Sequence, residues 1–142
     1  MKKKRIYQFL RADRDIRIAE AICFLGKKRI DYIDPRRIQV SASLFILPSA
    51  CIYHSCSPNA YINWNTLKLK SLKPLEKGET ITYHYGTSEY DYSVGAFLCR
   101  CGAINCVGYF KGFKYLSRKL QRDIVNFCSP YIKSLWKSEN YL

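Results

Sequence analysis

Three cysteines in the second half of the chain have the spacing of metal ligands. Cys99, Cys101 and Cys106 lie within eight residues of one another, and Gly102 allows the chain to turn tightly between them. A structural zinc site takes four such ligands in tetrahedral geometry, so one more donor must come from elsewhere in the chain. The spacing therefore predicts a zinc site that a distant residue completes.

The missing ligand is most simply supplied by Cys56, which lies on a loop restrained by Pro58. Cys51 is an alternative donor, but Cys23, Cys51 and Cys128 all lie on apolar stretches and are expected to be core residues. The expected metal ligands are therefore Cys56, Cys99, Cys101 and Cys106. Buried thiols without a metal are the alternative interpretation.

A second candidate for chemistry is the segment Thr80–Tyr85, which reads as a short strand. A period of two places Ile81, Tyr83 and Tyr85 on one face and Thr80, Thr82 and His84 on the other. Two tyrosines on one face can wall a narrow channel that desolvates the long apolar stem of a lysine. The alternative is that both tyrosines simply pack in the core. On this pattern His84 has no assigned role.

These segments carry a family resemblance. Residues 54–59 (H-S-C-S-P-N) resemble the H-S-C-x-P-N motif of SET-domain lysine methyltransferases, and residues 78–85 (G-E-T-I-T-Y-H-Y) resemble their G-E-x-[IL]-T-x-x-Y motif. The cysteines at 99, 101 and 106 resemble the zinc cluster of their post-SET segment. The likeness runs from about Ile38 to Leu116 and is closest to short, free-standing members of the family.

The resemblance implies a fold and a set of roles. It implies a mostly β SET-type domain, a β-clip with knot-like threading of the Cys56 loop and the Tyr85 segment, followed by a zinc-binding post-SET tail. It further implies transfer of a methyl group from S-adenosylmethionine to a protein lysine. In that reaction Tyr85 orients the amine, and Tyr83 limits the number of methyl groups, which favours monomethylation.

Cofactor contacts follow from the same resemblance. His54 offers its backbone to the adenine, Tyr53 takes the place of an asparagine that often contacts the cofactor, and Tyr109 and Phe110 either cover the adenine or belong to the core. The family's opening G-x-G is absent, because Tyr7 and Phe9 align with its glycines. Large side chains there obstruct a close approach to the backbone, so weakened cofactor binding is expected.

Composition limits the class of protein. The 142 residues suit one domain, and 24 basic against 11 acidic residues give a net charge of +13. This excess favours anionic partners such as nucleic acid or nucleosomes, or else a solvated basic surface. Seven cysteines, an odd number, favour a reducing compartment with zinc over a disulfide scaffold. With no recognisable signal peptide or membrane span, an intracellular protein, cytoplasmic or nuclear/nucleoid-associated, is expected.

The remaining pattern predicts many short strands and helix only at the end. The Ala, Glu and Leu content of residues 19–25 favours a helical turn, but the family resemblance implies a short strand there, ended by Gly26. A hairpin of residues 61–64 and 66–72 is also expected, with Leu67 and Leu69 facing the core. An apolar stripe predicts one helix ended by Ser129-Pro130, and one further turn is expected over residues 131–136. The stripe consists of Leu116, Leu120, Ile124 and Phe127. The expected divisions are residues 1–95 (SET core), 96–113 (zinc-binding segment) and 114–142 (helical tail).

The sequence thus predicts a lysine methyltransferase that uses S-adenosylmethionine and zinc and acts on a protein substrate, such as a histone or a nucleic-acid-associated protein, with no membrane partner. Two rival hypotheses stay open. One is a catalytically impaired SET-like module kept for binding, and calorimetry with the cofactor discriminates it. The other is a small basic zinc protein that binds nucleic acid, which predicts salt-dependent binding that survives mutation of Tyr85.

Overall fold

Short strands are the most numerous regular elements of the part of the chain that the structure describes. The computed structural model describes residues 8–32, 34 and 36–140. The strands in this part of the chain are β1 (Ala21–Phe24), β2 (Arg29–Ile30), β3 (Ile38–Gln39), β4 (Phe45–Ile46), β5 (Tyr53–His54), β6 (Ala60–Asn63), β7 (Lys68–Ser71), β8 (Thr82–Tyr83), β9 (Phe97–Leu98) and β10 (Tyr109–Phe110). The expectation of a mostly β fold is confirmed.

One small sheet contains the expected hairpin. β7 lies between β1 and β6, with both pairings antiparallel. The side chain of Asn63 closes the hairpin by accepting hydrogen bonds from the backbone N–H groups of Asn65 and Thr66. Leu69 is fully buried as predicted, whereas Leu67 sits in the turn with φ of 53° and packs against the edge of the core.

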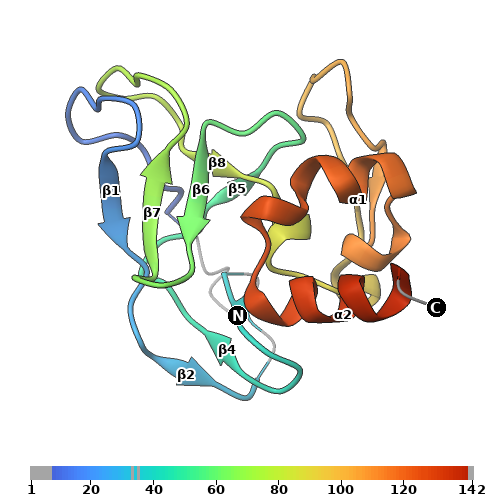
Figure 1. Ribbon diagram of the computed structural model, residues 1–142. Helices are drawn as coiled ribbons and strands as arrows, with labels where there is room; N and C mark the ends of the chain where they lie inside the picture. The colour runs from blue at the N-terminus through green and yellow to red at the C-terminus, as the bar shows by residue number, and fades with distance from the viewer. Residues whose placement is uncertain (1–7, 33, 35, 141–142) are drawn as a thin grey trace, which may run out of the picture.

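Another pairing brings the two candidate segments together. β5 and β8 form a parallel pair in which Tyr53 faces Thr82 and His54 faces Tyr83. The other two sheets are antiparallel: β2-β4-β3, and β9 with β10 beside the cysteines at 99, 101 and 106. Residues 54–59 and 78–85, far apart in sequence, therefore lie side by side (Figure 1).

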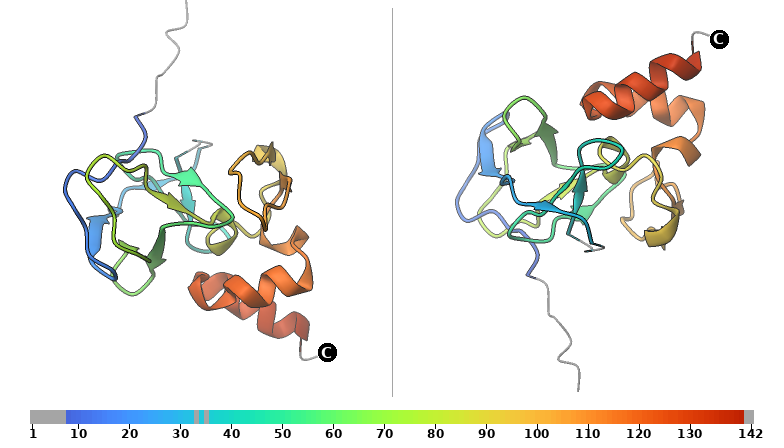
Figure 2. Two further views of the ribbon diagram at one scale, coloured as in Figure 1. Left: turned by 90° about the horizontal axis from the view of Figure 1, so that it is seen from above. Right: turned by 90° about the horizontal axis from the view of Figure 1, so that it is seen from below.

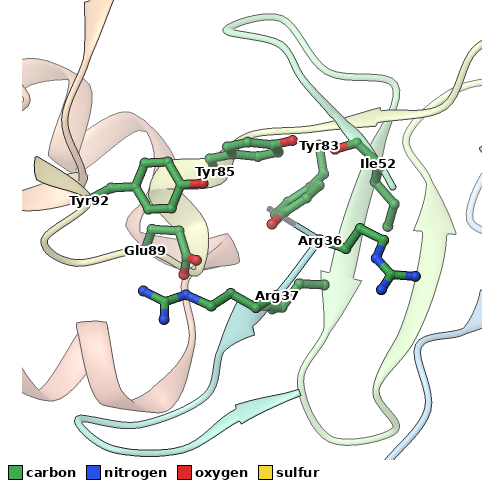
Figure 3. Close-up of a pocket in the computed structure, with 8 residues that line it drawn as sticks. Arg36, Arg37, Ile52, Tyr83, Tyr85, Glu89 and Tyr92 are labelled. Carbon is green, nitrogen blue, oxygen red and sulfur yellow. Dashed lines mark hydrogen bonds between the residues drawn. The ribbon is translucent and has the colours of Figure 1, made fainter. Parts of the chain in front are cut away.

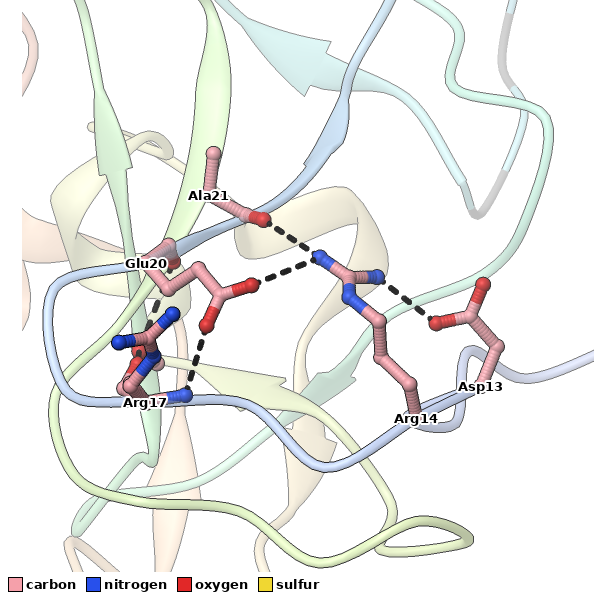
Figure 4. A network of polar contacts seen from close by, with 6 residues as sticks. Asp13, Arg14, Arg17, Glu20 and Ala21 are labelled. Carbon is pink, nitrogen blue, oxygen red and sulfur yellow. Dashed lines mark hydrogen bonds and ion pairs between the residues drawn. The ribbon is translucent and has the colours of Figure 1, made fainter.

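The N-terminal segment joins these sheets through single bridges. Phe9 pairs with Cys51, Arg11 with Thr80, and Ile16 with Leu75. Exposed charges then fix the loop before β1 (Figure 4): Arg14 bonds to Asp13, Glu20 and the carbonyl of Ala21, and Glu20 accepts from the Arg17 N–H. Solvent screens pairs this exposed and they add little to stability, so their role is to shape the loop.

The core lies between these sheets and is aliphatic. Its buried side chains alternate with exposed ones along the strands, as the period of two requires. It includes Ile16, Leu25, Ile38, Ile46, Ile52, Ile62, Leu69, Leu75, Ile81 and Tyr83. The strands that carry the candidate site, β5 and β8, are therefore held in place by packing against a continuous apolar core.

The C-terminal end is more helical than predicted. α1 (Arg118–Ile124), capped by the Ser117 hydroxyl, continues as a 3₁₀ turn η4 (Val125–Phe127), and a second helix α2 follows (Pro130–Asn140). The sequence predicted only one more turn there. The predicted stop at Ser129-Pro130 is wrong, because α1 ends at Ile124 and η4 at Phe127, before this dipeptide. Pro130 instead occupies the first turn of α2, where its missing N–H costs nothing. Neither α1 nor α2 is long and apolar enough to cross a membrane.

The helices pack beside the sheets rather than over them (Figures 1 and 2). They surround a separate buried cluster formed by Phe113, Cys128 and Ile132. Phe113 belongs to the 3₁₀ turn η3 (Phe113–Tyr115), and its N–H bonds to the carbonyl of Glu89. Gly112, with φ of 121°, makes this contact possible, because a Cβ there would lie 2.6 Å from the Tyr90 carbonyl oxygen. The tail is thereby held against the segment that follows Tyr85.

Candidate functional site

The four predicted zinc ligands converge. The Sγ atoms of Cys56, Cys99, Cys101 and Cys106 all lie within 4.8 Å of one another, and those of Cys56 and Cys99 are 3.9 Å apart. Tetrahedral zinc with Zn–S bonds of about 2.3 Å requires S···S separations of about 3.8 Å. The donor set and its spacing therefore fit a closed structural zinc site. Cys23, Cys51 and Cys128 lie outside this group.

Backbone contacts around the sulfurs complete this fit. The N–H groups of Val107 and Gly108 point at the Sγ atoms of Cys56 and Cys106, each at 3.5 Å. Asn105 donates to the Cys56 carbonyl at 3.1 Å and so ties the tail to the loop after β5. Such outer contacts orient thiolate ligands and stabilise their charge.

His54 connects the zinc cluster with Tyr85. Its Nδ1 accepts a hydrogen bond from the Tyr85 N–H at 3.0 Å, so the neutral ring carries its proton on Nε2, which lies 3.3 Å from Cys56 Sγ. Burial lowers the pKa of His54 to about 3, which keeps the ring neutral. His54 thus acts as a bracket that fixes the backbone of Tyr85 beside a metal ligand.

His84, which the sequence left without a role, packs against this bracket. It is 4% exposed, its ring meets that of His54 edge-on at 4.8 Å, and its Nδ1 accepts from the Gly86 N–H. The ligand atoms of His54, Cys56 and His84 also come within 4.8 Å of one another. Since one nitrogen of each imidazole already accepts a backbone hydrogen bond, the four-thiol set is the more complete metal site.

An open cleft of about 620 Å³ lies on one side of Tyr85. This volume is within the range of small-molecule sites, about 300–1,000 Å³. Its walls come from β5, β8 and the segment that carries the clustered cysteines. The lining includes Phe9, Tyr53, His54, Tyr85, Phe97 and Arg100. Tyr53 and His54, predicted to contact the cofactor, are thus both placed in this cleft.

A stacked pair of rings occupies one wall of the cleft. Phe9 and Tyr53 lie face to face, with ring centroids 3.6 Å apart and planes 4° from parallel. Phe9 is the residue aligned with a missing glycine and Tyr53 the one in place of the asparagine, so the two departures from the family pattern are physical partners. Tyr7, the other replaced glycine, lies outside the described residues.

A second, much smaller pocket lies on the other side of Tyr85 (Figure 3). Its free volume is about 10 Å³, room for roughly one water. Three tyrosines, a glutamate, two arginines and two isoleucines line it. They are Arg36, Arg37, Ile38, Ile52, Tyr83, Tyr85, Glu89 and Tyr92. Tyr85 and Tyr92 also line the large cleft, so the two spaces meet at these rings.

The two predicted catalytic tyrosines are held by hydrogen bonds. The Tyr85 hydroxyl donates to the Ile52 carbonyl at 2.5 Å, and the Tyr83 hydroxyl lies 3.1 Å from Ser88 Oγ. Burial raises the pKa of both phenols well above the usual range, so both remain protonated. Tyr83 and Tyr85 rings touch, with centroids 5.0 Å apart.

The strand that carries them is shorter than predicted. β8 contains only Thr82 and Tyr83, and the chain turns at Tyr85 into a 3₁₀ helix, η1 (Tyr85–Thr87). The side chain of His84 caps this turn by accepting from Gly86. Pairing with β5 ends at Tyr83, so Tyr85 is directed by the His54 bracket rather than by strand alternation.

Tyr109 and Phe110 do not line the cleft. Phe110 is fully buried beneath His54, with ring centroids 5.0 Å apart, whereas Tyr109 is 56% exposed on β10. Sequence reasoning also missed three residues of the site: Tyr92, Phe97 and Glu89. Phe97 stands just before the first zinc ligand, and Glu89 is a lone acid in a tyrosine-rich stretch; neither feature is distinctive in the sequence.

Comparison with known proteins agrees with this geometry. Residues 8–86 match the SET domain family. The chain is 30% identical over 86 residues to the methyltransferase flvH of Aspergillus flavus, covering 58% of this chain and 46% of that protein. It is 38% identical over 65 residues to the H3 lysine-36 specific histone-lysine N-methyltransferase of Saccharomyces cerevisiae, covering 42% of this chain and 9% of that enzyme.

The chain is also 33% identical over 76 residues to the H3 lysine-36 specific histone-lysine N-methyltransferase of Debaryomyces hansenii, covering 49% of this chain and 9% of that enzyme. The chain thus spans under half of one relative and about a tenth of the yeast enzymes. The family match covers more than half of the chain and includes both segments that meet at Tyr85. The chain belongs to the SET domain family.

Proposed function

We propose that this protein transfers a methyl group from S-adenosylmethionine to the side-chain amine of a protein lysine. The observation that carries the proposal is that Tyr85 and Tyr92 line both the open cleft and the small pocket. Two reactants can therefore approach one tyrosine from opposite sides, as an in-line displacement requires. The relatives named as methyltransferases support the same reaction class.

The open cleft is where the methyl donor would be held. Its volume suits a nucleoside-sized ligand, and His54, Ser55 and Phe97 offer backbone and ring surface to an adenosine group. When bound, the donor supplies an electrophilic methyl group on a sulfonium. Arg100 is the charged side chain among the described residues that line the cleft, and the Phe9–Tyr53 stack offers no charge to the amino-acid end of the donor.

The small pocket is where the amine would be held. The Tyr85 hydroxyl donates to Ile52, so its oxygen remains free to accept a hydrogen bond from the amine and direct its lone pair. Removing water from this pocket favours the neutral amine over the ammonium ion. We further propose that zinc at the four cysteines stabilises residues 96–113 as a post-SET segment between the core (1–95) and the helical tail (114–142).

Changing Tyr83 to phenylalanine should shift products from monomethyl-lysine towards di- and trimethyl-lysine. The Tyr83 hydroxyl and its partner Ser88 fill space beside the pocket, and deleting the hydroxyl frees that space for an added methyl group. Mass spectrometry of the product lysines measures the shift, with Tyr61→Phe as the control for loss of a phenol far from the pocket. Unchanged product ratios in Tyr83→Phe would remove the hydroxyl from product control.

S-adenosylmethionine should bind about tenfold more weakly than is usual for the family, a difference of about 1.4 kcal/mol. The aromatic stack buries the donor's charged end without matching partners, which is costly. A paired Phe9→Gly and Tyr53→Asn variant should recover this affinity in calorimetric titrations, whereas Phe24→Ala, a change at an exposed phenylalanine outside the cleft, should not. Weaker binding in the paired variant would mean that the stack itself contacts the donor.

The substrate is proposed to be a histone or another nucleic-acid-associated protein. Two of the relatives described above are named as H3 lysine-36 specific enzymes, and a net charge of +13 favours encounters with nucleic acid. The second candidate, a binding module without activity, is favoured by the Phe9–Tyr53 stack. It predicts normal zinc content with neither donor binding nor transfer.

The test is incubation of the zinc-loaded protein with methyl-labelled donor and separate samples of core histones, nucleosomes and whole-cell lysate. Labelled lysine in at least one sample is expected, and it should disappear with Tyr85→Phe. Normal zinc content with no donor binding and no transfer to any sample would favour the binding module.

A further inference from the structure

Glu89 is a buried acid in the wall of the small pocket. It is 2% exposed and shares the pocket with the rings of Tyr83, Tyr85 and Tyr92. Figure 3 shows the Glu89 carboxylate between the side chains of Tyr92 and Arg37, which line the same pocket. A carboxylate is rarely buried this deeply unless a cation or several donors match it.

The protein itself supplies only part of that match. Glu89 Oε2 accepts the Gln39 N–H at 3.0 Å, but none of the ion pairs found among the described residues includes Glu89. Of the two nearby cations, Arg36 pairs with Asp34 at 3.0 Å. The Arg37 guanidinium lies 4.1 Å from the centre of the Phe45 ring.

The backbone of Glu89 is fixed on both sides. Its N–H bonds to the Tyr85 carbonyl and its carbonyl accepts from the Phe113 N–H, each at 2.8 Å. Gln39 bonds to the neighbouring Tyr90 N–H as well. A carboxylate held this rigidly among three aromatic rings makes a site for a small cation, and the free volume of about 10 Å³ matches an ammonium head. The side chains of Arg37 and Tyr92 line the pocket and are partly exposed, so a lysine stem would reach the pocket past them.

We propose that Glu89 binds the ammonium group of the incoming lysine and accepts its proton. This role rests on the proposed function and adds a catalytic residue to it. One N–H bond of the ammonium breaks, its electron pair stays on nitrogen, and the proton passes to the Glu89 carboxylate. The neutral amine is then free to attack, and protonated Glu89 later returns the proton to water.

The electrostatics of the pocket agree with proton transfer. Burial raises the pKa of Glu89 to about 7, and the Gln39 N–H, Arg37 and the Ser88 hydroxyl oppose that rise only in part. The same burial lowers the pKa of an amine, so the two groups approach each other in acidity. The other charged or titratable groups that face this carboxylate are Arg36, Tyr83, Tyr85 and Tyr92.

A first test uses stability, which needs neither donor nor substrate. A raised pKa means that the native state holds the Glu89 proton more tightly than the unfolded chain does, so stability is lost as the pH rises from about 4.5 through 7. Glu89→Gln should therefore resist urea better than the unmodified protein at pH 8 and equally at pH 4, below the ordinary pKa of a glutamate. Loss of stability in Glu89→Gln at pH 8 would indicate a structural ion pair with Arg37 and overturn the proposal.

A second test probes the ammonium site with n-butylammonium, and with neutral n-butanol as its control. The ¹³C carboxyl signal of Glu89 should shift saturably with n-butylammonium only. Affinity should fall at least tenfold in Glu89→Gln and stay unchanged in Glu76→Gln, an exposed glutamate outside the pocket. Equal binding by Glu89→Gln, or none by the unmodified protein, would overturn the proposal.

The pH profile of methyl transfer separates catalysis from structure. Glu89→Gln should lose about 100-fold in rate at pH 7 and recover to within a few-fold near pH 10, where lysine is already neutral. An equal loss at every pH would refute the proton-acceptor role. If no lysine is methylated by the unmodified protein while Glu89-dependent n-butylammonium binding persists, the proposed reaction fails and the ammonium site stands.

Discussion

Replacing Tyr85 by phenylalanine should lower the rate of methyl transfer by about 100-fold or more, because one oriented hydroxyl at a reacting centre is worth that much. The fold should survive, since the ring keeps its contacts with His54 and Tyr83. Loss of the hydrogen bond to the Ile52 carbonyl should cost about 1 kcal/mol of unfolding free energy. Initial rates with labelled donor and urea unfolding measure the two effects.

Tyr61→Phe is the matched control, because Tyr61 lies on β6 outside both the cleft and the small pocket. It should keep full activity. A Tyr85→Phe variant as active as this control would place the chemistry elsewhere, whereas a loss of donor binding in Tyr85→Phe would make its effect one of assembly rather than of chemistry.

Replacing Cys99 by serine should remove most of the bound zinc, about one ion per chain in the unmodified protein. Structural zinc sites in small domains supply on the order of 10 kcal/mol of apparent binding free energy, so the segment around β9 and β10 should lose its structure. Because Phe97, Cys99, Arg100 and Cys101 line the cleft, donor binding should be lost with the metal. Elemental analysis, circular dichroism and calorimetry follow the three effects.

Cys23→Ser is the control, since Cys23 is a partly buried cysteine of β1 outside the thiol cluster. It should keep its zinc. Full zinc retention by Cys99→Ser, or loss of zinc from Cys23→Ser, would contradict the assignment of the ligands. A chelator should reproduce the Cys99→Ser behaviour in the unmodified protein.

The cluster of four thiols could be predicted from the sequence because its evidence is local. Three of its four thiols lie within one short segment, and the fourth lies in a loop with its own motif. The hairpin around Asn63 was predictable for the same reason, since alternation and turn residues act over a few positions. The meeting of residues 54–59 with 78–85 needed the family likeness, because a parallel pair has no connecting turn in the sequence.

The predictions that were wrong concern features that depend on packing between residues far apart in the sequence. The strand predicted through Tyr85 ends at Tyr83, because the backbone N–H groups of Tyr85 and Gly86 donate hydrogen bonds to the rings of His54 and His84, and the chain bends there. The second helix was underestimated, because a proline at Ser129-Pro130 reads equally as a stop and as a start. Glu89 shows no sequence signal at all: only its burial, which the tail at Phe113 helps to create, sets it apart from a surface acid.

The single bridges made by the N-terminal segment also bear on how the protein is synthesised. Phe9 can pair only after Cys51 has been synthesised. In the same way, Ile16 needs Leu75 and Arg11 needs Thr80. At about 5–20 residues per second, a ribosome takes several seconds to supply these partners. Contacts this distant in sequence also form slowly once they are available. Residues 9–16 of the growing chain are therefore expected to stay incompletely paired until β7 and β8 have left the ribosome.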